Sequence, residues 1–210
     1  GVISEKGFFV DDKESGMWAR FHDNGVIREI INYREGLSHG TRILLDKKGK
    51  LTQQENYKLN NLHGLQRYFH DTGKLKMEVN YDNGVLSGQF MKYYRNGKKQ
   101  ESCFYKDGFK HGKSFWFFEN ESISIEYPYE KGEINGIAKT FFNDGTLKSE
   151  STYLNNDLNG ESKEYYLSKK IKTKGVYKDG KKEGKWYFYD ENGSILEISK
   201  YKNGVKKWNE

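Results

Sequence analysis

The feature that constrains this chain most is a repeat of 24 residues that runs without insertion or deletion. One glycine keeps this period, at Gly16, Gly40, Gly64, Gly88, Gly112, Gly136, Gly160 and Gly184. A tyrosine keeps it too, at Tyr33, Tyr57, Tyr81, Tyr105, Tyr129, Tyr153, Tyr177 and Tyr201. Eight copies in phase indicate that one small structural unit is repeated and stacked, because no single copy is long enough to bury a core alone.

Two other positions of the repeat show where the chain turns, when the glycine is counted as position 0. Position 9 is glycine in six of the eight repeats, often after Asn or Asp as in Asn24-Gly25, which is typical of a hairpin turn. Position 20 is always Gly or Asn, the residues that tolerate a positive φ. Each repeat is therefore predicted to hold two short strands and two turns. Glu121 and Lys169 replace the glycine of position 9, so we expect irregular hairpin tips there.

The register of each hairpin follows from the length of its loop. A three-residue loop that ends in a left-handed glycine pairs position 5, which is mostly aromatic, with the mostly aliphatic position 11. Because side chains alternate along a strand, positions 5, 11 and 17 are then expected to share one face and form the core. The predicted fold class is all-β, an elongated antiparallel sheet of stacked 24-residue β-hairpin repeats.

The repeat also predicts how the chain is organised. Residues 1–15 match the second half of a repeat, with Phe9 where the tyrosine is expected. Residues 16–207 form eight tandem repeats in one array, and residues 208–210 are predicted to cap it, with Trp208 in place of the next glycine. The sequence begins at Gly1 and not at Met, which leaves a cytoplasmic location and an exported, trimmed chain both open.

Composition agrees with a folded repeat protein. Only 34% of the residues are hydrophobic and the mean hydropathy is −0.99, values that alone would suggest disorder. The aromatic content of 16%, with 23 Gly and 1 Pro, instead indicates a folded chain that turns often. A single cysteine excludes a disulfide framework and a cysteine-based zinc site.

These residues resemble the bacterial variant class of MORN repeats. The resemblance covers residues 16–207, and the first full repeat shows it clearly through Trp18, Phe21, Asn24-Gly25, Ile27, Tyr33 and Gly36. It implies a β-hairpin scaffold that binds partners. Some bacterial members of this class are antitoxin components of toxin–antitoxin pairs, so the resemblance also implies an antitoxin or immunity role for this chain. MORN repeats elsewhere are linked to phospholipid membranes and to protein assembly.

A second aromatic set lies at position 6, where the ends of the array are polar and the middle is aromatic. A repeating core does not require this change, so we interpret it as an exposed protein-binding surface. The alternative is that the sheet buries both of its faces and these rings are core. The predicted contact residues, including one tryptophan from position 4, are Tyr94, Trp116, Phe118, Phe142 and Tyr166.

Positive charge gathers near the C-terminus. Residues 160–210 hold 13 Lys and 8 acidic residues, a net charge of +5 out of +6 for the whole chain. An anionic partner such as a membrane surface would account for this charge, but a solvated lysine-rich face that keeps the sheet soluble is the preferred interpretation. The absence of arginine there disfavours nucleic acid. The candidate residues are Lys169, Lys170, Lys172 and Lys174.

No set of residues predicts catalysis or a cofactor. The sequence shows neither a catalytic triad that spacing alone can assemble nor a phosphate-binding loop. Histidines recur at position 23 and at position 6, but equivalent positions lie about 9–10 Å apart, too far to share a zinc ion. We therefore predict a non-catalytic, metal-free scaffold that binds another protein, with membrane attachment as the alternative.

Overall fold

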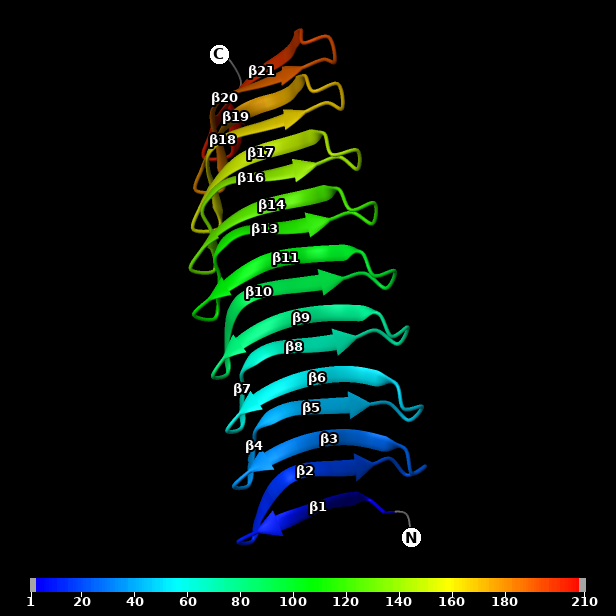
Figure 1. Cartoon of the computed structure of the whole chain (residues 1–210). Coiled ribbons are helices and arrows are strands. Elements are labelled where there is room, and N and C mark those ends of the chain that lie inside the picture. Colours follow the sequence, from blue (N-terminus) through cyan, green and yellow to red (C-terminus); the bar gives the residue numbers. More distant parts are fainter. Residues whose placement is uncertain (1–2, 208–210) are drawn as a thin grey trace. The chain divides into compact units, whose positions relative to one another are not determined.

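The computed structural model describes residues 3–207, which form strands joined by turns (Figure 1). Within this range no helix is long and apolar enough to cross a membrane. The predicted cap at residues 208–210, with Trp208, lies outside the described residues.

The chain divides into two compact units. The N-terminal unit extends through Lys99 and includes Phe104–Phe109, and the C-terminal unit includes Gln100–Cys103 and the chain from Lys110 onward. The strands of the N-terminal unit are β1 (Glu5–Val10), β2 (Lys13–Phe21), β3 (Ile27–Arg34), β4 (Leu37–Ser38), β5 (Gly40–Leu45), β6 (Leu51–Lys58), β7 (Asn61–Leu62), β8 (Gly64–Phe69), β9 (Leu75–Asp82) and β10 (Val85–Tyr93). Two strands supply residues to both units, β11 (Lys99–Lys106) and β12 (Phe109–Lys110). The strands of the C-terminal unit are β13 (Gly112–Phe117), β14 (Ile123–Glu130), β15 (Glu133–Ile134), β16 (Gly136–Phe141), β17 (Leu147–Leu154), β18 (Asp157–Tyr165), β19 (Ile171–Lys178), β20 (Lys181–Tyr189), β21 (Ile195–Lys202) and β22 (Val205–Lys207).

Each repeat whose strands lie in one unit folds into one antiparallel hairpin, and successive hairpins pair side by side within each unit (Figure 1). In the N-terminal unit β2 pairs with β3, which also pairs with β5 of the next repeat. In the C-terminal unit β19 pairs in the same way with β18 and β20. The predicted all-β fold class of antiparallel 24-residue hairpins is confirmed.

The hairpin tips have the predicted three-residue loop. In the first full repeat the His22 amide donates to the Val26 carbonyl at 2.8 Å, and the Gly25 amide donates to the His22 carbonyl at 2.9 Å. Gly25 has a φ of 81°, the left-handed conformation that ends such a loop. The residues of position 5 and position 11 then pair, as Phe21 does with Ile27.

The prediction of irregular tips at Glu121 and Lys169 is wrong. Both residues adopt the left-handed conformation, with φ of 71° and 67°. The Phe118 amide donates to the Ser122 carbonyl at 2.9 Å, and the Glu121 amide donates to the Phe118 carbonyl at 2.9 Å, as in the glycine-containing tips. The hydrogen bonds and the paired strands hold these residues in a conformation that their side chains disfavour.

The prediction that the tyrosine of position 17 shares a face with position 5 is wrong, because the hairpins contain a β-bulge. The bulge is present in every described full hairpin of the C-terminal unit and in β2–β3. Arg20 pairs with Glu29 but the next residue, Phe21, pairs with Ile27, so Arg28 is an extra residue in the second strand. The same shift separates Trp116 and Phe117 in β13. One extra residue reverses which face the rest of a strand presents. The tyrosines of position 17 therefore do not share a face with position 5.

The tyrosines instead lie on the face that carries positions 2, 4, 13 and 15, which we call the tyrosine face. Ring contacts on it join Trp186 to Tyr177 at 5.0 Å and to Tyr201 at 6.4 Å. Nearly all the buried residues belong to positions 2 and 15 of this face, among them Trp18, Ile31, Gln66, Val79, Cys103, Ser114, Ala138, Ser162, Trp186 and Ser199. The core is thus a narrow strip along the middle of the hairpins.

The face that carries positions 1, 3, 5 and 14 is here called the reverse face. Position 5 is placed there by its contacts: the Tyr165 hydroxyl donates to Glu150 of position 14 at 2.7 Å. The rings of Tyr187 and Tyr189, from positions 3 and 5, stack with centres 6.4 Å apart. Side chains on this face are half-buried or exposed, in contrast to the strip of buried residues on the tyrosine face.

Candidate binding surfaces

Position 6 lies where the first strand enters the hairpin tip, and its side chains are half-buried in every full repeat. Three of them link one tip to the next. The imidazole Nε2 of His22 lies 3.0 Å from the Leu45 carbonyl, and that of His70 lies 3.0 Å from the Tyr93 carbonyl. The Tyr166 hydroxyl donates to the Tyr189 carbonyl at 2.7 Å. A side chain with a donor at position 6 therefore stabilises the contact between neighbouring hairpins.

Phe118 and Phe142 depart from this pattern. Both occupy position 6 in the C-terminal unit, and a phenyl ring has no hydrogen-bond donor for the carbonyl of the next repeat. Both rings remain half-buried, so neither is enclosed by the fold. Linking the tips accounts for histidine and tyrosine at position 6, but it does not account for two phenylalanines.

Phe142 and Tyr166 line a depression at the tip end of the tyrosine face, which we call the tip depression. It encloses about 360 Å³ and is lined also by Lys148, Ser149, Glu164, Tyr165, Leu167 and Lys172. A lysine lies beside each ring: the Lys148 Nζ is 5.8 Å from the ring centre of Phe142, and the Lys172 Nζ is 5.8 Å from that of Tyr166. The depression offers two aromatic surfaces with positive charge at its edge.

The structure does not bring all five predicted aromatic residues together. Trp116 lies nearer the middle of its hairpin, where its ring centre is 5.6 Å from that of Tyr127 and 4.8 Å from the Lys110 Nζ. Tyr94 belongs to the N-terminal unit, whereas Phe118, Phe142 and Tyr166 belong to the C-terminal unit. Of the five, Phe142 and Tyr166 line the same depression.

The four predicted lysines do not form a single surface either. Lys172 lies against Tyr166 at the tip depression, whereas Lys174 lies on the reverse face with its Nζ 5.2 Å from the ring centre of Tyr187. Lys169 takes the left-handed position of its tip loop. The Lys170 Nζ donates to the Asn192 carbonyl of the next tip at 3.2 Å. Two of the four lysines thus have structural contacts at the tips.

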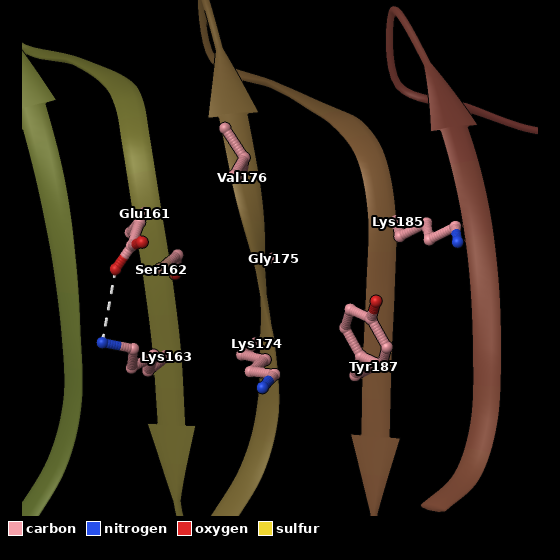
Figure 2. A pocket seen from close by; sticks show the side chains of 8 residues that line it. All are labelled: Glu161, Ser162, Lys163, Lys174, Gly175, Val176, Lys185 and Tyr187. Atoms are coloured by element: carbon pink, nitrogen blue, oxygen red, sulfur yellow. Dashed lines mark ion pairs between the residues drawn. The ribbon is translucent and has the colours of Figure 1, made fainter.

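A second depression lies on the reverse face of β18, β19 and β20, and the sequence analysis did not find it. Figure 2 shows its lining, in which Lys163, Lys174 and Lys185 come from three successive strands, Glu161 forms an ion pair with Lys163, and Lys185 extends toward the next strand. We call it the reverse depression; it encloses about 290 Å³. The lysines at positions 3 and 14 of this repeat are visible in the sequence, but they stand opposite each other only because the bulge sets the register.

The described residues offer no arrangement for metal chemistry. Within residues 3–207 no group of three or more His, Cys, Asp or Glu side chains is placed to hold a metal ion. The histidines of position 23 lie in the connection between hairpins, where the His39 amide donates to the Asn32 carbonyl at 2.8 Å.

A succession of antiparallel hairpins with left-handed residues at both turns defines a β-hairpin repeat protein. The model of the MORN repeat variant family matches seven segments, residues 15–35, 62–83, 86–107, 110–131, 134–155, 158–179 and 182–203. The chain therefore belongs to the MORN repeat variant family, whose members are typically non-catalytic. No curated protein matches the chain significantly. The family model does not match residues 36–61, yet β5 and β6 there pair with the same bulge as the other hairpins.

Proposed function

We propose that this chain is a non-catalytic scaffold that binds another protein through the position 6 aromatic residues of its C-terminal unit. The observation that carries the proposal is the pair Phe118 and Phe142. They stand where His22, His70 and Tyr166 use a donor side chain to join neighbouring tips, so these two repeats lose that hydrogen bond and present a half-buried ring instead. Aromatic residues at accessible positions are the usual anchors of protein interfaces.

The spacing of these residues suits an extended contact. Equivalent positions of neighbouring repeats are two strands apart, about 9–10 Å. Phe118, Phe142 and Tyr166 therefore offer successive anchor points along the tips, and the tip depression receives a side chain of the partner between Phe142 and Tyr166. Tyr166 has two roles in this proposal, because its hydroxyl is held by the next tip while its ring lines the depression.

The experiment is affinity capture from a lysate of the source cell with immobilised wild type and a Phe118→Ala/Phe142→Ala variant. A matched control, Phe104→Ala/Phe109→Ala, removes two exposed phenylalanines elsewhere. We expect a protein that wild type and control retain and the position 6 variant loses, and the purified pair should then bind directly. Equal recovery on all three matrices contradicts the proposal.

The captured protein also tests the antitoxin role that the family resemblance implies. If the role holds, expression of that protein alone arrests growth, and co-expression of wild type but not of the Phe118→Ala/Phe142→Ala variant restores it. Vesicles that contain anionic lipid test the alternative partner. Vesicle binding that disappears when Lys169, Lys170, Lys172 and Lys174 are replaced, with no protein captured, would favour the membrane over a protein.

A further inference from the structure

We propose that the reverse depression is a second binding site, which takes an extended acidic segment of a partner protein. Its residues lie on β18, β19 and β20, all in the C-terminal unit (Figure 2). The site faces away from the tyrosine face, and the proposal does not depend on the function proposed for the tip depression.

The first argument is the pairing of like charges. Lys163 and Lys174 stand directly opposite each other in β18 and β19. At the same pair of positions in other repeats, Arg67 stands opposite Glu78, and Lys139 stands opposite Glu150. Like charges directly opposite each other destabilise a sheet, whereas opposite charges stabilise it. Two lysines opposite each other therefore destabilise the sheet at this place, whereas a lysine opposite a glutamate would stabilise it.

A second like-charge pair lies beside the first. Lys185 of β20 stands opposite Lys200 of β21. Among the described residues, Lys163 is paired with Glu150 and Glu161, but neither Lys174 nor Lys185 has a carboxylate within ion-pair distance. The depression therefore carries excess positive charge that the chain itself does not neutralise, and an anionic partner would relieve the repulsion.

The remaining lining indicates what kind of anion fits. Val176 is 44% exposed in the depression, and Tyr187 offers a ring whose centre lies 5.2 Å from the Lys174 Nζ. Lysine ammonium groups act as separate point charges, unlike the planar fork of arginine that grips a phosphate with two parallel bonds. An apolar floor between separate charges suits a segment with two carboxylates and one apolar side chain.

An extended segment that crosses the strands can meet lysines on successive strands, because the long lysine side chains bridge the difference between its spacing and theirs. Alternate side chains of an extended chain lie on one side, about 6.6–6.8 Å apart. Lys163 and Lys174 stand on neighbouring strands about 4.8 Å apart, and Lys185 lies one strand further and two residues from Tyr187. A segment that crosses the strands therefore places one carboxylate near Lys174, a second near Lys185, and an apolar side chain over Val176.

The test is fluorescence anisotropy with a labelled peptide that carries Glu, Leu and Glu at alternate positions with Ser between them. The comparison peptide has Gln in place of Glu. We expect the wild-type chain to bind the Glu peptide and not the Gln peptide, with an affinity that falls as salt is raised, because exposed charges are screened over about 10 Å at 0.1 M.

Two double variants locate the site. Lys174→Gln/Lys185→Gln should weaken binding about tenfold or more, while the control Lys113→Gln/Lys139→Gln, which removes equal charge from the same face, should stay within about twofold of wild type. Lys185→Glu gives a second test at an exposed side chain and should abolish binding. Circular dichroism and Tm confirm that each variant folds.

Three outcomes would overturn this site: no binding of the Glu peptide at low salt, equal binding of the Glu and Gln peptides, or an equal loss in the control variant. The Phe118→Ala/Phe142→Ala variant should bind the peptide as wild type does. Loss of the tip contact and loss of the reverse site are therefore measured separately.

Discussion

At the scale of single residues, a large ring of the core lies against a small residue of the neighbouring repeat at some steps of the array. Gly175 at position 15 precedes Trp186 at position 2, and an added Cβ on Gly175 would lie 2.3 Å from the indole ring. Gly7 and Trp18 form the same combination, whereas Tyr127 precedes the small Ala138. At these steps a large ring lies against a residue with a small side chain or none, because a single-layer sheet has room for only one large ring there.

Gly175→Ala should therefore destabilise the protein although the substitution adds only a methyl group. Gly175 has no positive φ, so the cost arises from the close approach of the indole ring and not from the backbone. We expect a loss of about 2–3 kcal/mol in the free energy of unfolding, measured by urea denaturation. Ser151→Ala, at the same repeat position, is the control and should cost about 1 kcal/mol. Equal stability of Gly175→Ala and wild type would contradict this packing.

Glu121→Gly and Lys169→Gly should each stabilise the protein. Both residues are held at positive φ in regular tips, a conformation that costs an ordinary residue about 1–2 kcal/mol and glycine very little. We expect a gain of about 1 kcal/mol for each, seen as a higher urea midpoint with an unchanged slope. Gly145→Ala, which reverses the change in a neighbouring tip, should lower the midpoint.

At the scale of the elements, strands β2, β3, β5 and β6 are joined across the tyrosine face by a ladder of ion pairs. Arg20 contacts Glu29 at 2.9 Å, and Arg42 joins Glu29 at 2.5 Å to Glu55 at 3.0 Å. Burial by itself raises the pKa of Glu29, but hydrogen bonds from Arg20 and Arg42 outweigh it and hold the pKa below its usual value. Burial also lowers the pKa of Arg42, and its contacts with Glu29 reverse that effect.

Glu29→Gln should destabilise the protein by about 2 kcal/mol near neutral pH, because it leaves two partly buried guanidinium groups without a shared carboxylate. The lowered pKa of Glu29 contributes stability that is present above pH 4.5, its ordinary pKa, and is lost as the pH falls through the folded-state value. The variant should therefore show a shallower loss of stability on acidification. Glu191→Gln, at an exposed tip, is the control and should change stability by less than about 0.5 kcal/mol.

At the scale of the whole molecule, both units contain tyrosines that resist ionisation. In the N-terminal unit, burial and the nearby charge of Glu55 raise the pKa of Tyr68 to about 12. In the C-terminal unit, burial and a hydrogen bond to Glu150 raise the pKa of Tyr165 to about 12. Ionisation of these half-buried tyrosines should therefore destabilise both units in alkali.

The protein should unfold in alkali between pH 10 and pH 12. In this range the folded chain keeps phenolic protons that the unfolded chain has lost, so the stability they contribute is complete below pH 10 and disappears as the pH rises through about 12. Tyrosinate absorbance and circular dichroism, recorded on the same samples, should change together. Tyr68→Phe/Tyr165→Phe should move the transition to higher pH, and full ionisation of tyrosine with intact dichroism would refute the prediction.

The sequence by itself determined the features that depend on local chemistry. The period of 24 residues, the all-β fold class, the three-residue tip loops and the left-handed residues at position 20 were all readable from glycine and asparagine. Loop length and φ preference are properties of a few neighbouring residues. The same reasoning failed at Glu121 and Lys169, because strand pairing overrode their local preference.

Only the tertiary structure decided which residues share a face. The bulge at Arg28 and its equivalents reverses the second strand, so the tyrosines leave the face of position 5 and join Trp18 and Trp186 in the core. The sequence contains no marker for that extra residue, because a bulge is fixed by pairing across the whole hairpin. The reverse depression follows from the same register, and alternation along the sequence alone did not predict it.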